Sequence, residues 1–491
     1  MMHCHRLAAV VTILVLAIGC SGQHDPYAGL ETGADNAVVD AVFASWDVPG
    51  SPGCALAVAQ DGTLMYSRGY GYANLDHDIP VTPQTVFDVA SVNKQFVAAS
   101  LTMLALEGKL SLDDNVRKWL PELPEYEWPI TLRHMIYHTS GLRDYLNLFP
   151  LAGRNHYYPI SHPQILEMMS RQRALIFPPG EQHLYSNTAY MLLAQVLERA
   201  AGQSLGEFAE ERIFEPLGMK GSLMYDNYEE IIPRRATGYD RDDGGLVSMV
   251  HNYNFDVPGD GQLYSTVEDL LRWDNYLHGA EKPAIHSAML TEGTLNDGDP
   301  LGYTQGIYLR EYRGLRTLHH TGSSWGSRSI LIRFVEPGLS IAIACNDGYS
   351  NPRGMAWQVA DHYLADQLAP QSDGEEAGDD QQAADLAREP RTLTSEQLAE
   401  FAGVFFSAEL DATYRFAVVD EGLVVRIEQE LPLEVTPVAS DRFEIRFYDQ
   451  AYWEPPSASL EFDRNRTGAI TGFGLSSGSE RGIVFENGDG R

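Results

Sequence analysis

The segment 369–392 constrains the fold most, because it divides the chain into two parts, each long enough to form a globular unit of its own. It contains the run Ser372-Asp-Gly-Glu-Glu-Ala-Gly-Asp-Asp380 and almost no large apolar side chains. Such a stretch buries too little apolar surface to fold by itself, so it is predicted to be an acidic linker. With 491 residues and 44% hydrophobic residues, the chain can form a globular unit on each side. These units are expected at 35–368 and 393–491.

The first part mixes strand and helix patterns. Apolar runs around the turn Asp61-Gly62 predict a β-hairpin over 53–74. Helical spacing of apolar residues predicts helices over 91–110, 185–201 and 355–368. Three further strands are expected at Leu315–His320, Ser329–Val335 and Ser340–Cys345. Strands at both ends with helices between them predict one α+β domain whose sheet joins the two ends.

The second part contains short strand-like runs at even spacing. They are Tyr414–Val419, Leu423–Ile427, Arg442–Phe447, Ser457–Phe462, Ala469–Leu475 and Ile483–Phe485. Evenly spaced short strands with turns between them predict a small all-β barrel or sandwich. No chemistry is evident in it, and the acidic linker offers little packing. The barrel is therefore expected to be dispensable for whatever the first domain does.

The N-terminus has the pattern of an export signal. Arg6 precedes an apolar stretch, Leu7 to Ile18, which ends in Gly19-Cys20. This is typical of a secretory signal peptide, expected here over 1–19. A cysteine at this place predicts a bacterial lipoprotein with Cys20 as its lipidated first residue, and ordinary cleavage nearby is the alternative. The protein is then periplasmic or membrane-anchored, and it contacts a membrane only through this lipid.

Charge and cysteine content exclude several classes of function. The net charge of −33 argues against a nucleic-acid partner, because phosphate binding requires a basic face. After Cys20, only Cys54 and Cys345 remain. Both lie in apolar strand-like runs and are predicted to be buried free thiols. No His/Cys spacing suggests a zinc site, so neither a metal nor an organic cofactor is expected.

The sequence Ser91-Val-Asn-Lys94 opens the first predicted helix. A serine and a lysine three residues apart share one helix face, and a desolvated lysine can remove the proton of a serine hydroxyl. Backbone N–H groups at the start of the helix can stabilise an oxyanion. The alternative is structural, with Ser91 as an N-cap and Lys94 as a surface charge.

A tyrosine could complete the proton transfer. Tyr-x-Asn occurs five times, and Tyr185-Ser-Asn187 has the best context, because it directly precedes a predicted helix. A phenol whose pKa is lowered by nearby cations could move protons, while Asn187 could hold a substrate amide. Tyr145 is the main competitor.

A third motif is His319-His320-Thr321-Gly322-Ser323, at the end of a predicted strand. A strand ending in glycine lets a substrate backbone approach closely, and the Ser323 N–H could join that of Ser91 in an oxyanion hole. His320, Thr321 and Gly322 would line the substrate site. Because side chains alternate along a strand, only one of the two histidines can face the cleft.

These three motifs, in this order, resemble the serine β-lactamase and penicillin-binding protein superfamily, in particular its class C β-lactamase-like hydrolases. Further blocks carry the resemblance over residues 40–368. They are Phe87-Asp-Val-Ala-Ser91, Gly108-Lys-Leu-Ser-Leu-Asp-Asp114, His138-Thr-Ser-Gly-Leu142, Pro179-Gly-Glu181, Pro216-Leu-Gly-Met219 and Gly261-Gln-Leu-Tyr-Ser-Thr-Val-Glu-Asp269. The resemblance implies a β-lactamase/transpeptidase-like fold, an antiparallel sheet flanked by helices with a helical subdomain. It also implies Tyr185 as the catalytic tyrosine, a structural role for His138, and a lipocalin-like C-terminal domain.

The resemblance implies a serine hydrolase that forms an acyl-enzyme on a small-molecule or peptide substrate with a carbonyl group. The lactamases of this superfamily carry a lysine where this chain has His320. A histidine with an ordinary pKa near ~6.5 is mostly neutral at pH 7 and attracts a carboxylate less well. Esters, amides and peptides are therefore favoured over β-lactams. The alternative is a non-catalytic envelope protein that keeps the fold for binding.

Overall fold

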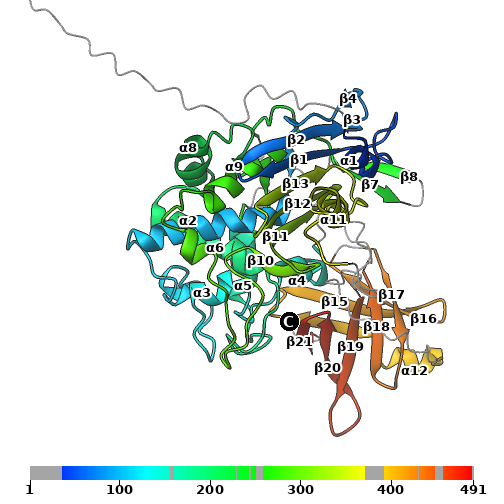
Figure 1. Cartoon of the computed structure of the whole chain (residues 1–491). Helices are drawn as coiled ribbons and strands as arrows, with labels where there is room; N and C mark the ends of the chain where they lie inside the picture. The colour runs from blue at the N-terminus through cyan, green and yellow to red at the C-terminus, as the bar shows by residue number, and fades with distance from the viewer. Residues whose placement is uncertain are drawn as a thin grey trace, which may run out of the picture.

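The computed structural model describes residues 36–154, 160–227, 229–242, 245–249, 258–370, 392–428, 431–447 and 457–488. The predicted signal peptide at 1–19, Cys20 and most of the predicted linker at 369–392 lie outside these residues. The described chain forms an α+β domain and, after it, a β-barrel packed against that domain (Figure 1). The predicted fold class is confirmed.

A six-stranded antiparallel sheet forms the centre of the first domain, in the order β10-β11-β12-β13-β1-β2. Its strands are β1 (Cys54–Gln60), β2 (Thr63–Tyr70), β10 (Tyr308–Tyr312), β11 (Leu315–Ser324), β12 (Ser327–Phe334) and β13 (Leu339–Cys345). The predicted hairpin and the three later strands are present. Asp61 and Gly62 both have positive φ, as a two-residue hairpin turn requires. β1 also pairs with β13, so the two ends of the domain meet in mid-sheet.

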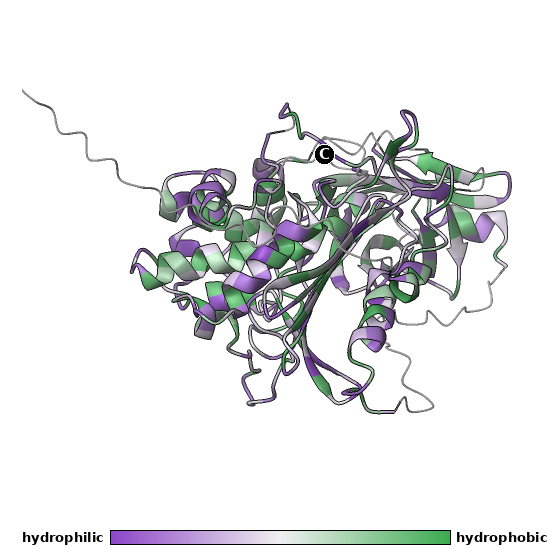
Figure 2. Ribbon diagram, turned by 45° about the horizontal axis from the view of Figure 1, so that its top comes forward, coloured by the Kyte–Doolittle hydropathy of each residue, from purple (hydrophilic) through white to green (hydrophobic). Residues whose placement is uncertain are grey.

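Helices cover both faces of this sheet (Figure 2). In β1, Cys54, Leu56 and Val58 face a core shared with α1 (Ala37–Val42) and α11 (Pro352–Tyr363). The alternate residues are alanines and face the larger core, which includes α2 (Lys94–Leu106), α6 (Asn187–Ala201) and α9 (Val267–His278). Small side chains on that face let α9 lie close to β1 and β13.

The remaining elements of the first domain are short. The helices are α3 (Leu132–Ile136), α4 (Tyr145–Leu151), α5 (His162–Ser170), α7 (Leu205–Ala209), α8 (Glu215–Leu217) and α10 (His286–Met289), with the single turns η1 (Ala90–Asn93), η2 (Val116–Lys118) and η3 (Glu210–Phe214). Small sheets are formed by β3 (Tyr72–Asn74) with β4 (Ile79–Pro80), by β5 (Phe87–Asp88), β9 (Leu263–Ser265) and β6 (Leu223–Met224), and by β7 (Tyr239–Asp242) with β8 (Gly245–Ser248).

Cys54 and Cys345 form a disulfide, so the prediction of two free thiols was wrong. The two residues are direct partners across β1 and β13, with their Cα atoms 4.0 Å apart. Both side chains point into the core beneath α11. The sequence shows each cysteine in an apolar run, but the register that brings the two together depends on strands that are 291 residues apart.

The second unit is a closed barrel in which each strand pairs with the next and β14 closes on β21. Its elements are α12 (Ser395–Ala399), β14 (Gly403–Ser407), β15 (Ala412–Val419), β16 (Gly422–Ile427), β17 (Leu433–Pro437), β18 (Arg442–Arg446), β19 (Ser457–Arg464), β20 (Ile470–Ser477) and β21 (Glu480–Asn487). Alternating inward positions carry contacting aromatic rings such as Phe405, Phe416, Phe462 and Phe473. These rings fill the interior, as in other small barrels.

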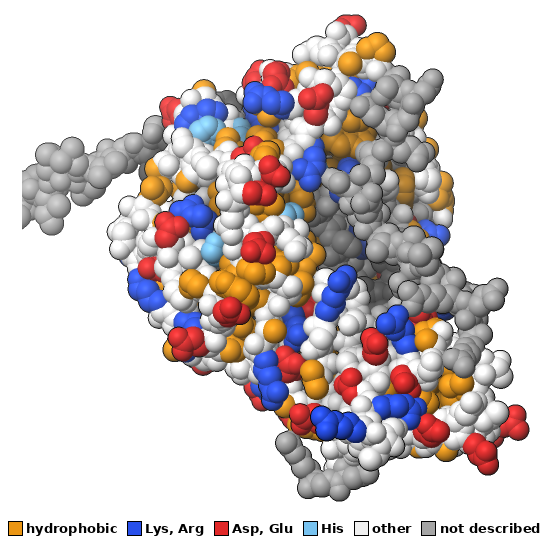
Figure 3. All heavy atoms as spheres, turned by 90° about the horizontal axis from the view of Figure 1, so that it is seen from below, with side chains coloured by type: hydrophobic (Ala, Val, Ile, Leu, Met, Phe, Trp, Pro, Cys, Tyr) orange, Lys and Arg blue, Asp and Glu red, His pale blue; other side chains and the backbone are white. Residues whose placement is uncertain are grey.

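Acidic and basic side chains are interspersed on the face shown in Figure 3. Among the described helices, none has the length and apolar character needed to cross a bilayer.

Candidate active site

Ser91 lies in η1, the short turn between β5 and α2. The preceding residue, Ala90, has φ of 47°, a region that non-glycine residues rarely adopt. Its N–H donates to the Asp88 carboxylate at 2.8 Å, and the N–H of Val89 donates to the carbonyl of Leu263 at 2.9 Å. These contacts hold the strained turn in place. Strain of this kind is concentrated at functional sites.

Lys94, at the start of α2, is fully buried beside Ser91. Its Nζ lies 3.0 Å from the Ser91 Oγ, 3.1 Å from the Asn187 Oδ1 and 2.6 Å from the carbonyl oxygen of Asp260. Burial lowers the pKa of Lys94, because the charged form loses its hydration, and the carboxylates of Asp260 and Asp144 only partly oppose this. The structure thus supplies the desolvated lysine that the sequence predicted, rather than a surface charge.

Tyr185 lies on the other side of the pair. The Lys94 Nζ is 4.8 Å from the centre of its ring. Burial raises the pKa of Tyr185 well above its ordinary value, and a hydrogen bond with Ser91 opposes this only in part. The expectation of a phenol made more acidic by cations was therefore wrong. Tyr185 is a neutral hydroxyl that can relay a proton without existing as a phenolate.

His138 fixes the Tyr185 loop. Its ring centre is 4.3 Å from that of Tyr185. The Ser186 N–H donates to its Nδ1 at 3.0 Å, and its Nε2 lies 3.1 Å from the Tyr303 hydroxyl. This is the structural role that the resemblance implied.

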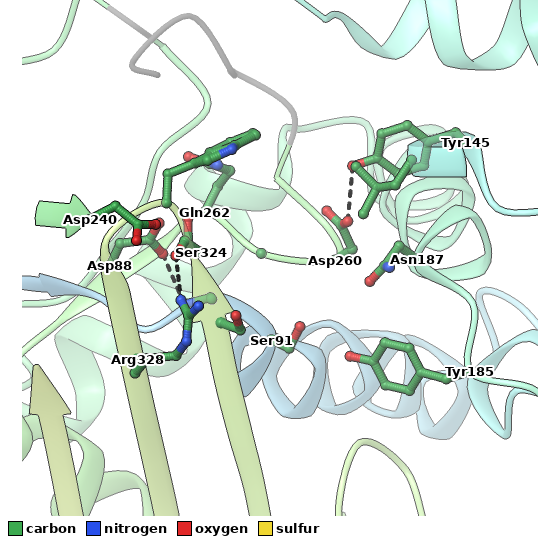
Figure 4. Close-up of a pocket in the computed structure, with 15 residues that line it drawn as sticks. Asp88, Ser91, Tyr145, Tyr185, Asn187, Asp240, Asp260, Gln262, Ser324 and Arg328 are labelled. Carbon is green, nitrogen blue, oxygen red and sulfur yellow. Dashed lines mark hydrogen bonds between the residues drawn. The ribbon is translucent and has the colours of Figure 1, made fainter. Parts of the chain in front are cut away.

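The competing tyrosine has a different partner. The Tyr145 hydroxyl donates to the Asp260 Oδ2 at 2.9 Å. This hydrogen-bonded pair lies apart from Ser91, at another side of the cavity (Figure 4). Asn187, by contrast, reaches Lys94 directly. Of the two candidates, Tyr185 is the one that contacts the Ser91–Lys94 pair.

The end of β11 approaches the turn that carries Ser91. A Cβ placed on Gly322 would lie 2.1 Å from the carbonyl oxygen of Val89, so only glycine permits this approach. The Ser329 hydroxyl, on β12, donates to the same carbonyl at 2.8 Å. Ser323 follows Gly322 and lines the cavity together with Ser91. This places the two predicted oxyanion donors at one site.

His320 does not behave as predicted. It is 2% exposed, and its Nδ1 lies 2.6 Å from the Thr321 carbonyl oxygen. His320, Thr321 and Gly322 were all expected to line the substrate site, but none of them lines the cavity. Burial and the nearby charge of Lys94 lower the pKa of His320 to about 3. The expected titration near neutral pH is therefore corrected. Alternation along β11 holds, since His320 packs beside Tyr185 while His319 packs against Trp357.

A cavity of about 330 Å³ opens above Ser91. Three carboxylates, those of Asp88, Asp240 and Asp260, line it together with Arg328. Asp88, Asp240 and Arg328 lie at one end and Asp260 lies opposite (Figure 4). Burial raises the pKa of Asp88 and of Asp260.

The sequence of residues 39–365, well over half of the chain, matches the family model described as Beta-lactamase. The chain belongs to the Beta-lactamase family. Penicillin-binding protein 4* of Bacillus subtilis is 28% identical over 410 residues, which cover 79% of this chain and 86% of that protein. A D-aminopeptidase of Gluconobacter oxydans is 29% identical over 60% of this chain and 56% of its own length. The chain therefore spans little more than half of that relative.

The solved structures that it resembles include the octameric penicillin-binding protein homologue from Pyrococcus abyssi. The TM-score is 0.58 at 22% identity, and the match covers 92% of this chain and 98% of that chain. This likeness extends the shared fold over the barrel as well as over the Beta-lactamase domain.

Sequence reasoning missed Asp88, Asp240, Asp260, Asp144 and Arg328 as site residues. Asp260 directly precedes Gly261 to Asp269, one of the sequence blocks that carry the family resemblance. Its distance along the chain from the other site residues does not mark it as part of the site. Among the described residues, no group of three or more His, Cys, Asp and Glu side chains is arranged to hold a metal ion.

Proposed function

We propose that this protein is a serine hydrolase that cleaves amide or peptide bonds through an acyl-enzyme on Ser91. One observation carries the proposal: the buried Lys94, whose pKa is lowered, lies 3.0 Å from the Ser91 hydroxyl. A lysine in this state can accept the serine proton. Family membership and the two relatives named above, a penicillin-binding protein and a D-aminopeptidase, support the same reaction type.

In the proposed reaction the Ser91 Oγ attacks the substrate carbonyl carbon while Lys94 takes the hydroxyl proton. The carbonyl oxygen becomes an oxyanion, which accepts hydrogen bonds from the N–H groups of Ser91 and Ser323. Collapse of this intermediate breaks the C–N bond, and the leaving amine receives the proton from Lys94 through the Tyr185 hydroxyl. Water then attacks the ester on Ser91 and gives a proton to Lys94. The bond between the acyl carbon and the Ser91 Oγ breaks, the Oγ takes that proton from Lys94, and the acid product leaves.

The charges of the cavity favour substrates with a free ammonium group near the cleaved bond. Asp88, Asp240 and Asp260 supply up to three negative charges. Arg328 adds one positive charge, and its Nη1 donates to the carbonyls of Ser324 and Ser327 at 2.7 and 2.8 Å, so carboxylates outnumber cations among the residues that line the cavity. His320 is buried and uncharged, so it offers no cation to the carboxylate of a β-lactam. An amino-acid amide with a free α-amino group fits these charges better.

The test compares three substrates at equal concentration: a D-amino-acid p-nitroanilide, its N-acetylated form, and a chromogenic cephalosporin. The expected order of kcat/KM is free amine first, then the acetylated amide, then the cephalosporin. Ser91→Ala should remove all turnover and leave the circular dichroism spectrum unchanged. Wild-type turnover in this variant would disprove the assignment of the nucleophile, and a preference for the cephalosporin would disprove the substrate class.

Covalent labelling distinguishes this proposal from the alternative, in which the protein binds a ligand without catalysis. An alkyl fluorophosphonate with a fluorescent tag should label wild-type protein at Ser91 within minutes and leave Ser91→Ala unlabelled. A folded wild-type protein that does not react with this probe would favour the binding role.

A further inference from the structure

The barrel reaches the active-site framework through buried polar contacts. Glu409 lies in the turn between β14 and β15, and Glu480 is the first residue of β21. The Nη1 of Arg143, in the first domain, donates to the Glu409 Oε1 at 2.9 Å, and its Nη2 donates to the Arg481 carbonyl at 2.9 Å. The side chains of Arg143, Glu409 and Glu480 are only 3%, 6% and 0% exposed. Charged side chains are almost never buried to this extent unless they are paired.

Further hydrogen bonds across the same interface fix its geometry. The N–H of Arg173 donates to the Glu409 Oε1 at 2.9 Å, and the Gln172 Nε2 donates to the Glu409 carbonyl at 3.0 Å. The hydroxyl of Tyr414, inside the barrel, donates to the Leu151 carbonyl at the end of α4 at 2.8 Å. Interfaces fixed by several buried hydrogen bonds resist sliding, so the barrel is held in one position against α4.

From Glu480 a continuous chain of hydrogen bonds leads to the nucleophile. The Asp144 N–H donates to the Glu480 Oε1 at 3.0 Å. The Asp144 carboxylate in turn accepts the Asn187 N–H at 2.6 Å. The Asn187 Oδ1 lies 3.1 Å from the Lys94 Nζ, which lies 3.0 Å from the Ser91 Oγ.

Helix α4 provides a second route. Asp144 is its N-cap and accepts the Leu146 N–H at 3.0 Å. Tyr145 begins the helix, and its hydroxyl holds the Asp260 carboxylate. The Asp260 carbonyl accepts a hydrogen bond from Lys94. Both routes run from the barrel, through the start of α4, to the ammonium group of Lys94.

We propose that Glu480 of the barrel is a positioning residue for the Ser91–Lys94 pair, acting through Asp144 and Asn187. The inference rests on the proposed function. It reverses the expectation that the barrel is dispensable, because the barrel holds the N-terminus of the helix that orients Lys94. Catalysis is sensitive to such positioning, since a misplacement of about 1 Å can reduce a rate by about 10²-fold.

The charges around Glu480 indicate which substitutions are informative. Its carboxylate contacts Arg143, Asp144, Asn147 and Ser479. Its Oε2 is 4.0 Å from the Arg143 Nε, and neither atom has a hydrogen-bond partner within the described residues. Burial and the Asp144 charge raise the pKa of Glu480 to about 7. A neutral glutamine therefore preserves the Oε1 acceptor at little cost, whereas leucine fills the space and removes the acceptor.

The test compares Glu480→Gln, Glu480→Leu and, as a matched control, Glu486→Leu, which alters an exposed glutamate on the same strand. Each full-length variant is assayed for amide hydrolysis and for the rate of fluorophosphonate labelling at Ser91, and its folding is checked by thermal unfolding. Glu480→Leu should lower both kcat and the labelling rate on the order of ten- to a hundredfold, with KM within about threefold. Glu480→Gln and Glu486→Leu should retain rates within about threefold of wild type.

A double-mutant cycle with Asp144→Ala tests the path. If the two residues act along one chain, the double variant loses no more activity than the more impaired single variant. Folded Glu480→Leu protein with wild-type kcat and labelling rate would overturn the inference, as would independent, multiplicative losses in the cycle. Failure of wild-type protein to label at all would instead contradict the proposed function, so the two failures are distinguishable.

Discussion

The disulfide between Cys54 and Cys345 leads to a quantitative prediction about stability. It closes a loop that spans 291 residues and is fully buried. In the chain-entropy model a loop of this length restricts the unfolded chain by about 5–6 kcal/mol, whereas measured disulfides typically contribute about 2–4 kcal/mol. Removal of the bond should therefore lower the free energy of unfolding by at least about 2 kcal/mol.

The assay is urea unfolding of wild-type protein and of the Cys54→Ala/Cys345→Ala variant, each refolded with and without a reductant, because a buried bond reacts only after unfolding. With an m-value of about 3 kcal/mol/M, a loss of 3 kcal/mol lowers the midpoint by about 1 M. Reduction should lower the urea midpoint of the wild-type protein and leave that of the double variant unchanged. The double variant controls for lost packing around the sulfur atoms, because reductant leaves it unchanged.

Two results would refute this reasoning. Titration of both Cys54 and Cys345 in the oxidised, denatured wild-type protein, counted as two thiols more than the double variant gives under the same conditions, would show that the bond is absent. An unchanged midpoint after complete reduction would show that the bond is present but that the β1–β13 pairing does not depend on it.

Three further predictions concern the site. Burial lowers the pKa of Lys94, and a lysine must be neutral to act as a base. The value of kcat/KM should therefore rise with pH and reach its plateau below about pH 10.4, the pKa of an ordinary lysine. A kcat/KM that falls over this range would contradict the role of Lys94 as the base. The pH profile of kcat/KM should show no inflection from His320 between pH 5 and 8, because burial lowers the pKa of His320 to about 3. His320→Gln should therefore leave the shape of this profile unchanged. Loss of an inflection near ~6.5 in that variant would show that the imidazole is accessible. Gly322→Ala should reduce the labelling rate of Ser91 more than about tenfold. The new Cβ would lie 2.1 Å from the Val89 carbonyl oxygen, so the backbone that carries an oxyanion donor must move. A labelling rate equal to that of wild type would show that β11 can shift without loss of function.

The local parts of this structure could be predicted from the sequence. The hairpin at Asp61-Gly62, the turn that opens α2 at Ser91 and the strands before and after Glu336-Pro337-Gly338 each depend on neighbours in the chain. The expectation that one sheet joins the two ends of the domain is confirmed by the pairing of β1 with β13, but the register of that pairing could not be predicted. The pairing of Cys54 with Cys345 follows from β1 and β13 lying side by side, which neither segment encodes alone.

For the active site too, the residues could be predicted from local sequence, whereas their pKa values depend on the folded structure. The motif residues Ser91, Lys94 and Tyr185 could be found from spacing and resemblance. The pKa of Tyr185 and of His320 could not, because burial sets both values. Glu480 was the hardest case, since nothing in the sequence connects a barrel strand to a helix that begins 335 residues earlier, at Tyr145.

The pairing of β1 with β13 also determines when this molecule can fold during its synthesis. The hairpin of β1 and β2 is complete soon after Tyr70 has been made, but the other edge of β1 acquires its partner only when Leu339–Cys345 emerges. At about 5–20 residues per second, this takes on the order of 15 to 60 s. Throughout that interval an apolar strand edge stays open, and the helices that cover the sheet lack the surface on which they pack. Nascent chains that end before Leu339 are therefore expected to remain unfolded and to be bound by chaperones or proteases that recognise open strands.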